Sequence, residues 1–209
     1  MLGIRFVTVV PGGSVSVRTS LLAVLTIGPA YGFQLHGELA ARTAGRRRVN
    51  VGQIYGTLER LIMQAAIESA GTTDDGLPLY RLTPAGHAEA LEWLHDTDSA
   101  VGDEWDDLVD RVLIASSLPR TESDVDAQAI IAGNRAWWIT RRDAAPRGPV
   151  DTAQDRLAVA AASALAEAAL RWLDEAELQL LTAEPGSIER GLSEERPRRG
   201  RRPAAVLEP

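Results

Sequence analysis

The sequence contains no cysteine and no lysine, and aromatic residues make up only 5% of its 209 residues. Without cysteine the chain forms no disulfide, no thiolate metal site and no cysteine nucleophile. No apolar run approaches the ~18 residues that a membrane-spanning helix requires, and the start of the chain lacks the layout of a signal peptide. We therefore expect a cytoplasmic protein with no membrane association.

Histidine is also scarce, with His36, His87 and His95 as its only examples. His87 and His95 are two helical turns apart, which is too far for a shared metal ion without further ligands. The carboxylates of residues 103–110 are dense, but at the start of a helix they are explained by the helix dipole. Phosphate-loop, nucleophile-elbow and dinucleotide-binding motifs are missing. The sequence predicts no enzymatic activity, no cofactor and no metal site.

The formal net charge of −7 is distributed unevenly along the chain. Residues 1–95 carry a net charge of +1, residues 96–189 a net charge of −11, and residues 190–209 a net charge of +3. The near-neutral first part contains three consecutive arginines at positions 46–48. This distribution indicates that the two halves of the chain have different tasks.

Residues 50–61 have the pattern of an amphipathic helix. Ile54, Leu58, Leu61 and Ile62 recur at helical spacing and predict one apolar face. Asn50 is placed to cap the helix, and Gln53 three residues later completes a capping box. A polar, uncharged first turn that follows three arginines suits a DNA groove. For this stretch taken alone, an ordinary helix with a solvated face is the alternative.

We expect a DNA-contacting surface on and around this helix. The arginines would bind phosphates, whereas Gln53 and Thr57 would read base edges in the major groove. The full predicted set is Arg46, Arg47, Arg48, Asn50, Gln53, Tyr55, Thr57, Arg60 and Arg81.

The predicted elements of the first half follow the order helix, helix, helix, hairpin, helix. Gly28-Pro29 must stop the first helix, Asp75-Gly76 is a strong turn signal, and Thr83 caps the last helix. The helices are expected at 18–27, 32–43, 51–65 and from 84 on, and the strands at 67–69 and 79–82. This order is typical of a winged helix-turn-helix domain, which we place at residues 18–96 after a flexible extension at 1–17.

Three segments carry a resemblance to a known family: GPAYGFQL at residues 28–35, VGQIYGTLERL at residues 51–61 and YRLTPAG at residues 80–86. In this order and at this spacing they resemble the PadR-type transcriptional regulators. The resemblance implies a bacterial winged-helix dimer that represses promoters and, in many members, releases DNA when a small phenolic or drug-like compound binds. It also implies that residues 50–60 form the recognition helix and that Tyr55 lies beside the DNA backbone.

The chain departs from the family pattern at two places in the wing. The family usually has glycine just before the first wing strand, where this chain has Ala65 and Ala66. Its wing is commonly basic, whereas the tip here contains Asp74 and Asp75. Carboxylates repel phosphates, so we do not expect this tip to grip DNA in the usual way. Arg81 on the returning strand is expected to compensate.

The second half is predicted to be helical over residues 104–183. Apolar periodicity predicts helices near 105–118 and 122–142, and a linker rich in proline and glycine follows at 141–149. The last periodic run is about 30 residues long, and its stripe includes Leu157, Trp172 and Leu180. We interpret this stripe as a homodimer interface, because two recognition helices one DNA turn apart read a palindrome; packing on its own chain is the alternative. Residues 184–209 are predicted to form a disordered basic tail.

Tryptophan is concentrated in this helical half, at Trp105, Trp137, Trp138 and Trp172. Flat aromatic walls suit planar ligands, so Trp105, Trp137 and Trp138 are candidates for binding a small aromatic effector. Ordinary packing in the core or in a dimer interface explains them equally well.

The sequence as a whole predicts a mainly α-helical protein with a small β-hairpin wing, in which a winged helix-turn-helix domain precedes a C-terminal helical dimerisation domain. Its predicted function is that of a sequence-specific, ligand-responsive, dimeric repressor that binds double-stranded DNA. An effector in the helical half would change the separation of the two recognition helices. The alternative is a winged-helix module that binds protein and does not bind DNA specifically, which the acidic wing and the acidic second half favour.

Overall fold

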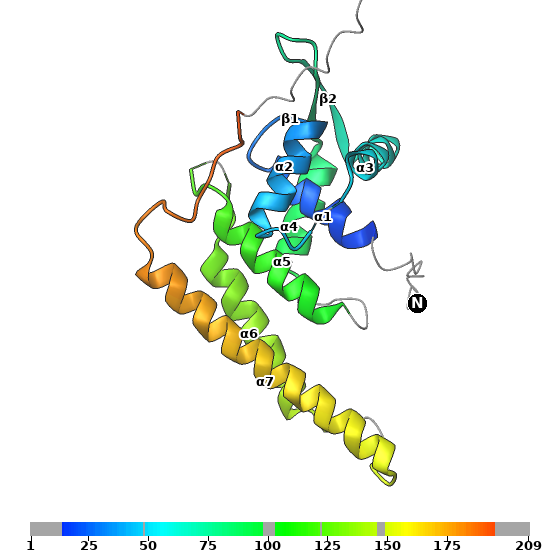
Figure 1. Cartoon of the computed structure of the whole chain (residues 1–209), viewed down its shortest axis with the longest axis vertical. Helices are drawn as coiled ribbons and strands as arrows, with labels where there is room; N and C mark the ends of the chain where they lie inside the picture. The colour runs from blue at the N-terminus through cyan, green and yellow to red at the C-terminus, as the bar shows by residue number, and fades with distance from the viewer. Residues whose placement is uncertain (1–13, 48, 98–102, 122, 146–148, 195–209) are drawn as a thin grey trace, which may run out of the picture.

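The computed structural model describes residues 14–47, 49–97, 103–121, 123–145 and 149–194. Its helices and its three-stranded sheet form a winged-helix part, at the top of Figure 1, and a helical part that extends below it. The elements are α1 (Ser14–Leu25), β1 (Ala30–Tyr31), α2 (Gly32–Arg42), α3 (Val51–Met63), β2 (Ile67–Thr72), β3 (Pro78–Leu82), α4 (Pro84–His95), α5 (Glu104–Ser117), α6 (Ala127–Asp143) and α7 (Ala153–Thr182). The predicted fold class, mainly α-helical with a small wing, is confirmed.

The first helix begins earlier than the sequence indicated. α1 starts at Ser14, and Val17 is buried in the winged-helix core. The prediction of a flexible extension is therefore wrong for residues 14–17, which belong to α1. Residues 1–13 lie outside the described ranges. Leu21, Leu22 and Leu25 are buried because α1 is surrounded by the other elements of this core, so more than one of its faces is apolar.

α3 ends in a backbone conformation that L-residues rarely adopt. Ala65 has a φ of 55°, and the amide of Ala66 donates to the carbonyl oxygen of Leu61 at 2.9 Å. The left-handed region costs a residue with a Cβ about 1–2 kcal/mol, which is why glycine is the common residue at helix ends of this kind. This chain tolerates the strain in a turn that places Ile67 in the core.

The wing is an antiparallel sheet with the strand order β1-β3-β2. β2 and β3 form the predicted hairpin, and Ala30 of β1 pairs with Tyr80 of β3. The sequence analysis missed β1 because a strand of two residues has no period of its own. At the hairpin turn the Leu77 amide donates to the Thr73 hydroxyl at 2.9 Å, and Gly76 has a φ of 85°.

α4 packs closely on the turn before β2. Thr83 caps the helix as predicted and accepts a hydrogen bond from the Gly86 amide at 3.1 Å. A Cβ at Gly86 would lie 1.9 Å from the carbonyl oxygen of Ala66, so only glycine permits this approach. The contact holds the wing against the helix that leads into the second half of the chain.

α5, α6 and α7 contribute most of a second core, which includes Ile131 and Trp138. α7 has 30 residues, of which only Ala166, Ala169 and Leu173 are buried. Its N-terminal half continues along α6 to the lower end of the molecule in Figure 1. Little of this half is covered by the rest of the chain.

Residues 184–194, which we call the strap, return from the end of α7 to the winged-helix part (Figure 1, orange to red). The Arg190 amide donates to the carbonyl oxygen of Ser117 at 3.0 Å, and Leu192 packs against the winged-helix core. The prediction of a disordered tail from residue 184 is therefore wrong for the strap, because composition does not reveal partners that are distant in the sequence. Residues 195–209, with the basic cluster, lie outside the described ranges.

Candidate nucleic-acid interface

α3 presents an exposed polar face opposite its apolar one. Ile54, Leu58 and Leu61 are fully buried in the winged-helix core, as the periodicity predicted. The prediction is wrong for Ile62, which is 45% exposed. Gln53 and Arg60 are exposed on the other side of the helix. In Figure 1, α3 lies at the edge of the winged-helix part, so this face is open to a large partner.

Asn50 and Gln53 form a reciprocal capping box at the start of α3, as predicted. The Gln53 amide donates to Asn50 Oδ1 at 2.8 Å, and the Asn50 amide donates to Gln53 Oε1 at 3.1 Å. The cap uses the side-chain oxygen of Gln53 and leaves its NH2 group to donate to another molecule. The first turn of α3 contains no acidic residue, so the positive end of the helix dipole remains available to an anion.

Thr57 lies on the buried face of α3. Its side chain is 4% exposed, and its hydroxyl donates to the Gln53 carbonyl oxygen at 2.8 Å and accepts from the Arg60 guanidinium at 3.0 Å. The prediction placed Thr57 on the polar face. Position 57 is four residues after Gln53 and three after Ile54, at the border of the two faces, and the fold buries it. In the free protein Thr57 is a positioning residue for Arg60, and its contact with a base remains a prediction.

Tyr55 packs against the start of α2. A Cβ at Gly32 would lie 2.6 Å from Cε1 of Tyr55, so the glycine leaves the space that the ring occupies. The rings of Tyr55 and Tyr80 both pack against the winged-helix core, and burial, together with Tyr55 and Glu59, raises the pKa of Tyr80. Tyr80 therefore stays neutral at physiological pH. The contact of Tyr55 with the DNA backbone remains a prediction.

Arg46 and Arg47 are bound to acidic side chains of α5. Arg46 Nη2 lies 2.7 Å from Asp106 Oδ1, and Arg47 forms an ion pair with Asp110. Burial disfavours the charge of Arg47, but the hydrogen bond and the negative charge of Asp110 outweigh it, and the pKa of Arg47 is raised. The expectation that these arginines stand open for phosphates is therefore incorrect for the free protein. Arg48 lies outside the described residues.

Arg81 is paired across the wing. Its Nε donates to Glu68 Oε1 on β2 at 2.8 Å, and both side chains are exposed. An exposed pair of this kind contributes at most ~1 kcal/mol, so Arg81 can exchange its partner at little cost. Asp74 and Asp75 at the tip are exposed, which leaves the tip acidic.

A buried ionic junction on α2, which the sequence analysis missed, joins the winged-helix part to the strap. Arg42 Nε lies 2.9 Å from Glu38 Oε2, and both side chains are 0% exposed. Arg42 also donates to the carbonyl oxygens of Ser117 at 2.6 Å and of Arg190 at 2.7 Å. Glu38 accepts from the Ser193 amide at 2.7 Å. The sequence contained one sign of this junction: Glu38 and Arg42 are four residues apart on one predicted helix and can pair there.

The three candidate effector residues do not converge on one ligand site. Trp105 packs edge-on against Trp172, with ring centroids 5.8 Å apart. Trp137 and Trp138 form a second edge-on pair at 4.9 Å, and Arg141 lies over both rings. Trp138 is 1% exposed and belongs to the core. These contacts are those of ordinary packing, which was the alternative for these residues.

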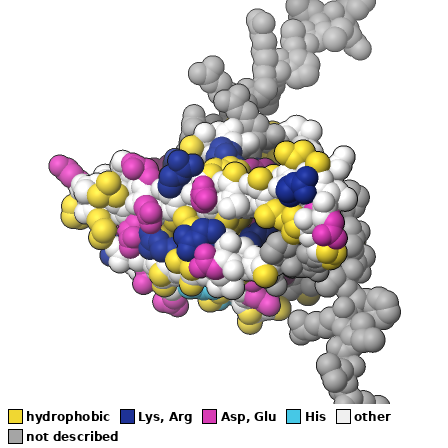
Figure 2. All heavy atoms as spheres, turned by 90° about the horizontal axis from the view of Figure 1, so that it is seen from below, with side chains coloured by type: hydrophobic (Ala, Val, Ile, Leu, Met, Phe, Trp, Pro, Cys, Tyr) yellow, Lys and Arg dark blue, Asp and Glu magenta, His cyan; other side chains and the backbone are white. Residues whose placement is uncertain are grey.

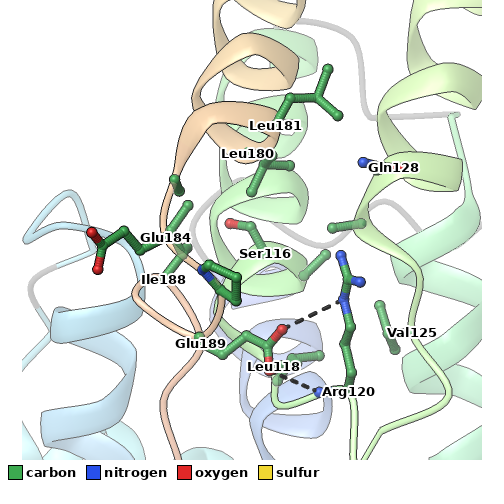
Figure 3. Close-up of a pocket in the computed structure, with 15 residues that line it drawn as sticks. Ser116, Leu118, Arg120, Val125, Gln128, Leu180, Leu181, Glu184, Ile188 and Glu189 are labelled. Carbon is green, nitrogen blue, oxygen red and sulfur yellow. Dashed lines mark hydrogen bonds and ion pairs between the residues drawn. The ribbon is translucent and has the colours of Figure 1, made fainter.

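A cavity of about 460 Å³ lies between the C-terminal ends of α5 and α7 and the start of α6 (Figure 3). Its lining contains none of the three tryptophans. The strap covers one side of it, and Arg120 on the opposite side faces Glu189 of the strap (Figure 3).

In the described ranges, no group of three acidic or histidine side chains is arranged to hold a metal ion. In the same ranges, none of the helices has the length and apolar character required to cross a membrane.

Comparison with known proteins identifies the winged-helix part. No protein with curated function matches the chain. Among solved structures, Bacillus subtilis PadR in complex with operator DNA is 18% identical, covers 76% of this chain and 94% of its own, and has a TM-score of 0.38. A transcriptional regulator from Clostridium thermocellum is 21% identical, covers 47% of this chain and 89% of its own, and has a TM-score of 0.36.

A third structure, Bacillus subtilis PadR in complex with p-coumaric acid, is 16% identical, covers 83% of this chain and all of its own, and has a TM-score of 0.37. Residues 21–92 match the model of the transcriptional regulator PadR-like family. The match contains α2, α3 and the wing, with Gln53 and Arg60 on the exposed face described above. Through these residues the winged-helix part is similar to the PadR-like family of transcriptional regulators.

Proposed function

We propose that the protein is a sequence-specific DNA-binding regulator that acts in the cytoplasm as a homodimeric repressor and responds to a small ligand. The observation that carries the proposal is the exposed, capped face of α3, on which Gln53 and Arg60 lie and whose first turn has no acidic residue. The major groove of double-stranded DNA admits a helix with such a face. The match of residues 21–92 to the PadR-like family of transcriptional regulators supports the same function.

The exposed residues of α3 have separate roles in this proposal. Gln53 donates to a base edge, and Arg60, held by Thr57, binds a base or a phosphate. Gly56 lies between them on the helix, and a Cβ at this position would meet nothing within 4 Å. The fold therefore does not require glycine here, and the bare helix surface favours close approach of DNA.

Arg46 contributes through an exchange of partners. Its ion pair with Asp106 is exposed on both sides, at 36% and 52%, and a DNA phosphate offers the same charge and a similar acceptor oxygen. Arg47 stays with Asp110, because that side chain is 0% exposed and would be left as an uncompensated buried charge. Phosphate binding also releases counterions from DNA, which favours the exchange at Arg46. Arg46 therefore adds affinity without sequence preference.

The proposed homodimer forms through the N-terminal half of α7. Leu157 is 71% exposed and Val159 is 40% exposed. Figure 2, seen from the lower end of the molecule, shows exposed hydrophobic side chains between charged ones. Replacing Leu157 with Glu is expected to give monomers in sedimentation experiments. Replacing Leu178 with Glu, at a leucine that is 53% exposed near the other end of α7, is the control and should leave the dimer intact.

The test of DNA binding is fluorescence anisotropy with the DNA upstream of the protein's own gene, random competitor DNA and a salt series. The proposal expects binding that survives the competitor and weakens as salt rises. Replacing Gln53 with Ala should reduce the preference for the specific site about tenfold, from the loss of one base contact. Gln179→Ala is the matched control, because it makes the same change at an exposed glutamine of α7 and should leave the sequence preference unchanged.

The second candidate is a winged-helix module that binds protein, and one observation favours it. The arginines before α3 are already paired with acidic residues, and the wing tip is acidic. This function predicts no specific DNA binding even at low salt. A preference for specific DNA that the Gln53→Ala variant loses would exclude it.

A further inference from the structure

We propose that the cavity under the strap binds a small molecule with an apolar body and one anionic group, which competes with Glu189 of the strap for Arg120. The inference deepens the proposed ligand response and rests on the proposed function only for its effect on DNA. The binding step involves the helical part and the strap, its effect on the strap involves α2 as well, and neither requires DNA.

The size and walls of the cavity suit such a body. Its volume of about 460 Å³ is in the range of ligand sites in proteins, ~300–1,000 Å³. Leu118, Val125, Leu180 and Ile188 line it from α5, α6, α7 and their connections (Figure 3). Leu118 and Val125 are already buried, so an apolar ligand that fills this space covers the half-buried Leu180 and Ile188 and removes its own apolar surface from water, which favours binding.

We infer the anionic group of the ligand from Glu189, whose carboxylate lies at the rim of the cavity beside Arg120. The Arg120 amide donates to Glu189 Oε2 at 3.3 Å, and Arg120 Nε lies 3.5 Å from Glu189 Oε1. Both distances exceed the ~2.7–2.9 Å of a strong charge-assisted hydrogen bond, and the Arg120 side chain is 77% exposed. Arg120 is therefore weakly held and can exchange Glu189 for a ligand anion. Glu184, also on the rim, is exposed and disfavours a second negative charge.

Displacement of Glu189 acts on the winged-helix part through the residues that follow it. Arg190 and Gly191 offer their carbonyl oxygens to Arg42 at 2.7 and 3.1 Å, and the Ser193 amide donates to Glu38. Both partners are on α2, the helix that precedes α3. A ligand that takes the place of Glu189 therefore loosens the junction between the strap and α2.

The binding step can be tested with two probes of the same shape, octanoate and its uncharged amide, octanamide. Isothermal titration with the full chain should show one site per chain and about tenfold tighter binding of octanoate, as expected for one charge-assisted contact. Arg120→Gln should abolish the difference between the probes. Glu189→Gln removes the competing carboxylate and should tighten octanoate binding severalfold. Arg156→Gln, at an exposed arginine near the far end of α7, is the control and should bind like the wild type.

The effect on the strap can be measured by hydrogen exchange and by tryptic cleavage after Arg190. Octanoate should speed exchange of the Ser193 amide and cleavage after Arg190, whereas octanamide should do so only weakly. The Arg120→Gln variant should show fast exchange without any ligand, because its strap has lost the same contact.

Three results would overturn the inference: absence of octanoate binding at millimolar concentration, equal binding of the two probes, or octanoate binding that Arg120→Gln leaves unchanged. Octanoate binding with an unaltered strap would overturn the coupling. DNA affinity is measured first on the ligand-free protein. A protein that binds octanoate but no DNA contradicts the proposed function alone, and one that binds DNA but no octanoate contradicts this inference alone.

Discussion

Two groups of arginines connect the first half of the chain to α5, and they differ in their partners. Arg42 is 0% exposed and is held by Glu38 and by main-chain carbonyl groups. Arg46 and Arg47 are 36% and 23% exposed and are held by the side chains of α5 alone. Only four or five residues separate the first group from the second. The role of an arginine therefore cannot be assigned from its residue type. It depends on how deeply the side chain is buried and on the kind of partner that it has.

The physical consequence is that the first connection is permanent and that the second is exchangeable only at Arg46. A charge that has lost its water needs fixed partners, and breaking a buried pair leaves an uncompensated charge. Main-chain carbonyl groups are fixed partners because the fold holds them in place. The Asp106 carboxylate is 52% exposed, and water and other anions compete for its contact with Arg46, which is therefore weak. The Asp110 carboxylate is 0% exposed and keeps Arg47 in place. DNA phosphates can replace Asp106, but not Glu38 or Asp110, so Arg46 is the exchangeable arginine.

The largest expected effect is that of Arg42→Met on stability. The substitution leaves the buried Glu38 carboxylate without its cation and should lower the free energy of unfolding by about 3–5 kcal/mol. Arg46→Met removes only a partly exposed pair and should cost less than about 1 kcal/mol. Urea unfolding of the two variants measures both values. Equal losses would show that the two arginine groups are energetically alike.

Removing the strap tests the main-chain part of the same junction. A chain that ends after Ser187 lacks the carbonyl groups that Arg42 holds and the amide that donates to Glu38. It should be less stable by about 2 kcal/mol, because buried polar groups lose partners that water replaces only in part. A chain that ends after Glu194 keeps these contacts and should match the full chain in thermal unfolding. A loss of stability in this control would instead assign the effect to the basic end of the chain.

The smallest expected effect concerns the exchangeable arginine. Asp106→Asn removes the nearer of the two carboxylates that bind Arg46 and should strengthen DNA binding about two- to fivefold, since only the looser contact with Asp110 at 3.7 Å remains to be given up. Asp124→Asn makes the same charge change at an exposed position away from Arg46 and is the control. Anisotropy titrations at several salt concentrations separate the two variants. An identical gain in both would mean that net charge alone matters.

The parts of the interface that the sequence predicted correctly are those made within one helix or one turn. The capping box of Asn50 and Gln53, the cap of Thr83 and the apolar stripe of Ile54 depend only on residues a few positions away. Thr57 shows where such reasoning stops. It is four residues after Gln53 and three after Ile54, so its spacing places it at the border of the two faces, and the packing around α3 decides that it is buried.

Other features were beyond sequence reasoning because their partners are far apart in the chain. The pairing of Arg46 with Asp106 spans 60 positions, and that of Glu38 with Ser193 spans 155. The strand β1 exists only because β3 lies beside it. Nothing in the composition of residues 184–194 indicates that they lie against α2.

The sequence by itself determined the order of the elements, the caps that begin α3 and α4, and the apolar faces that pack into the two cores. These follow from hydrogen bonds and periodicities that act over one or two helical turns. The tertiary structure alone decided which arginines are buried, which carboxylates they meet and where the strap binds. Those choices depend on which surfaces the packing of distant helices brings within a few ångströms, where the loss of water decides the strength of each ion pair.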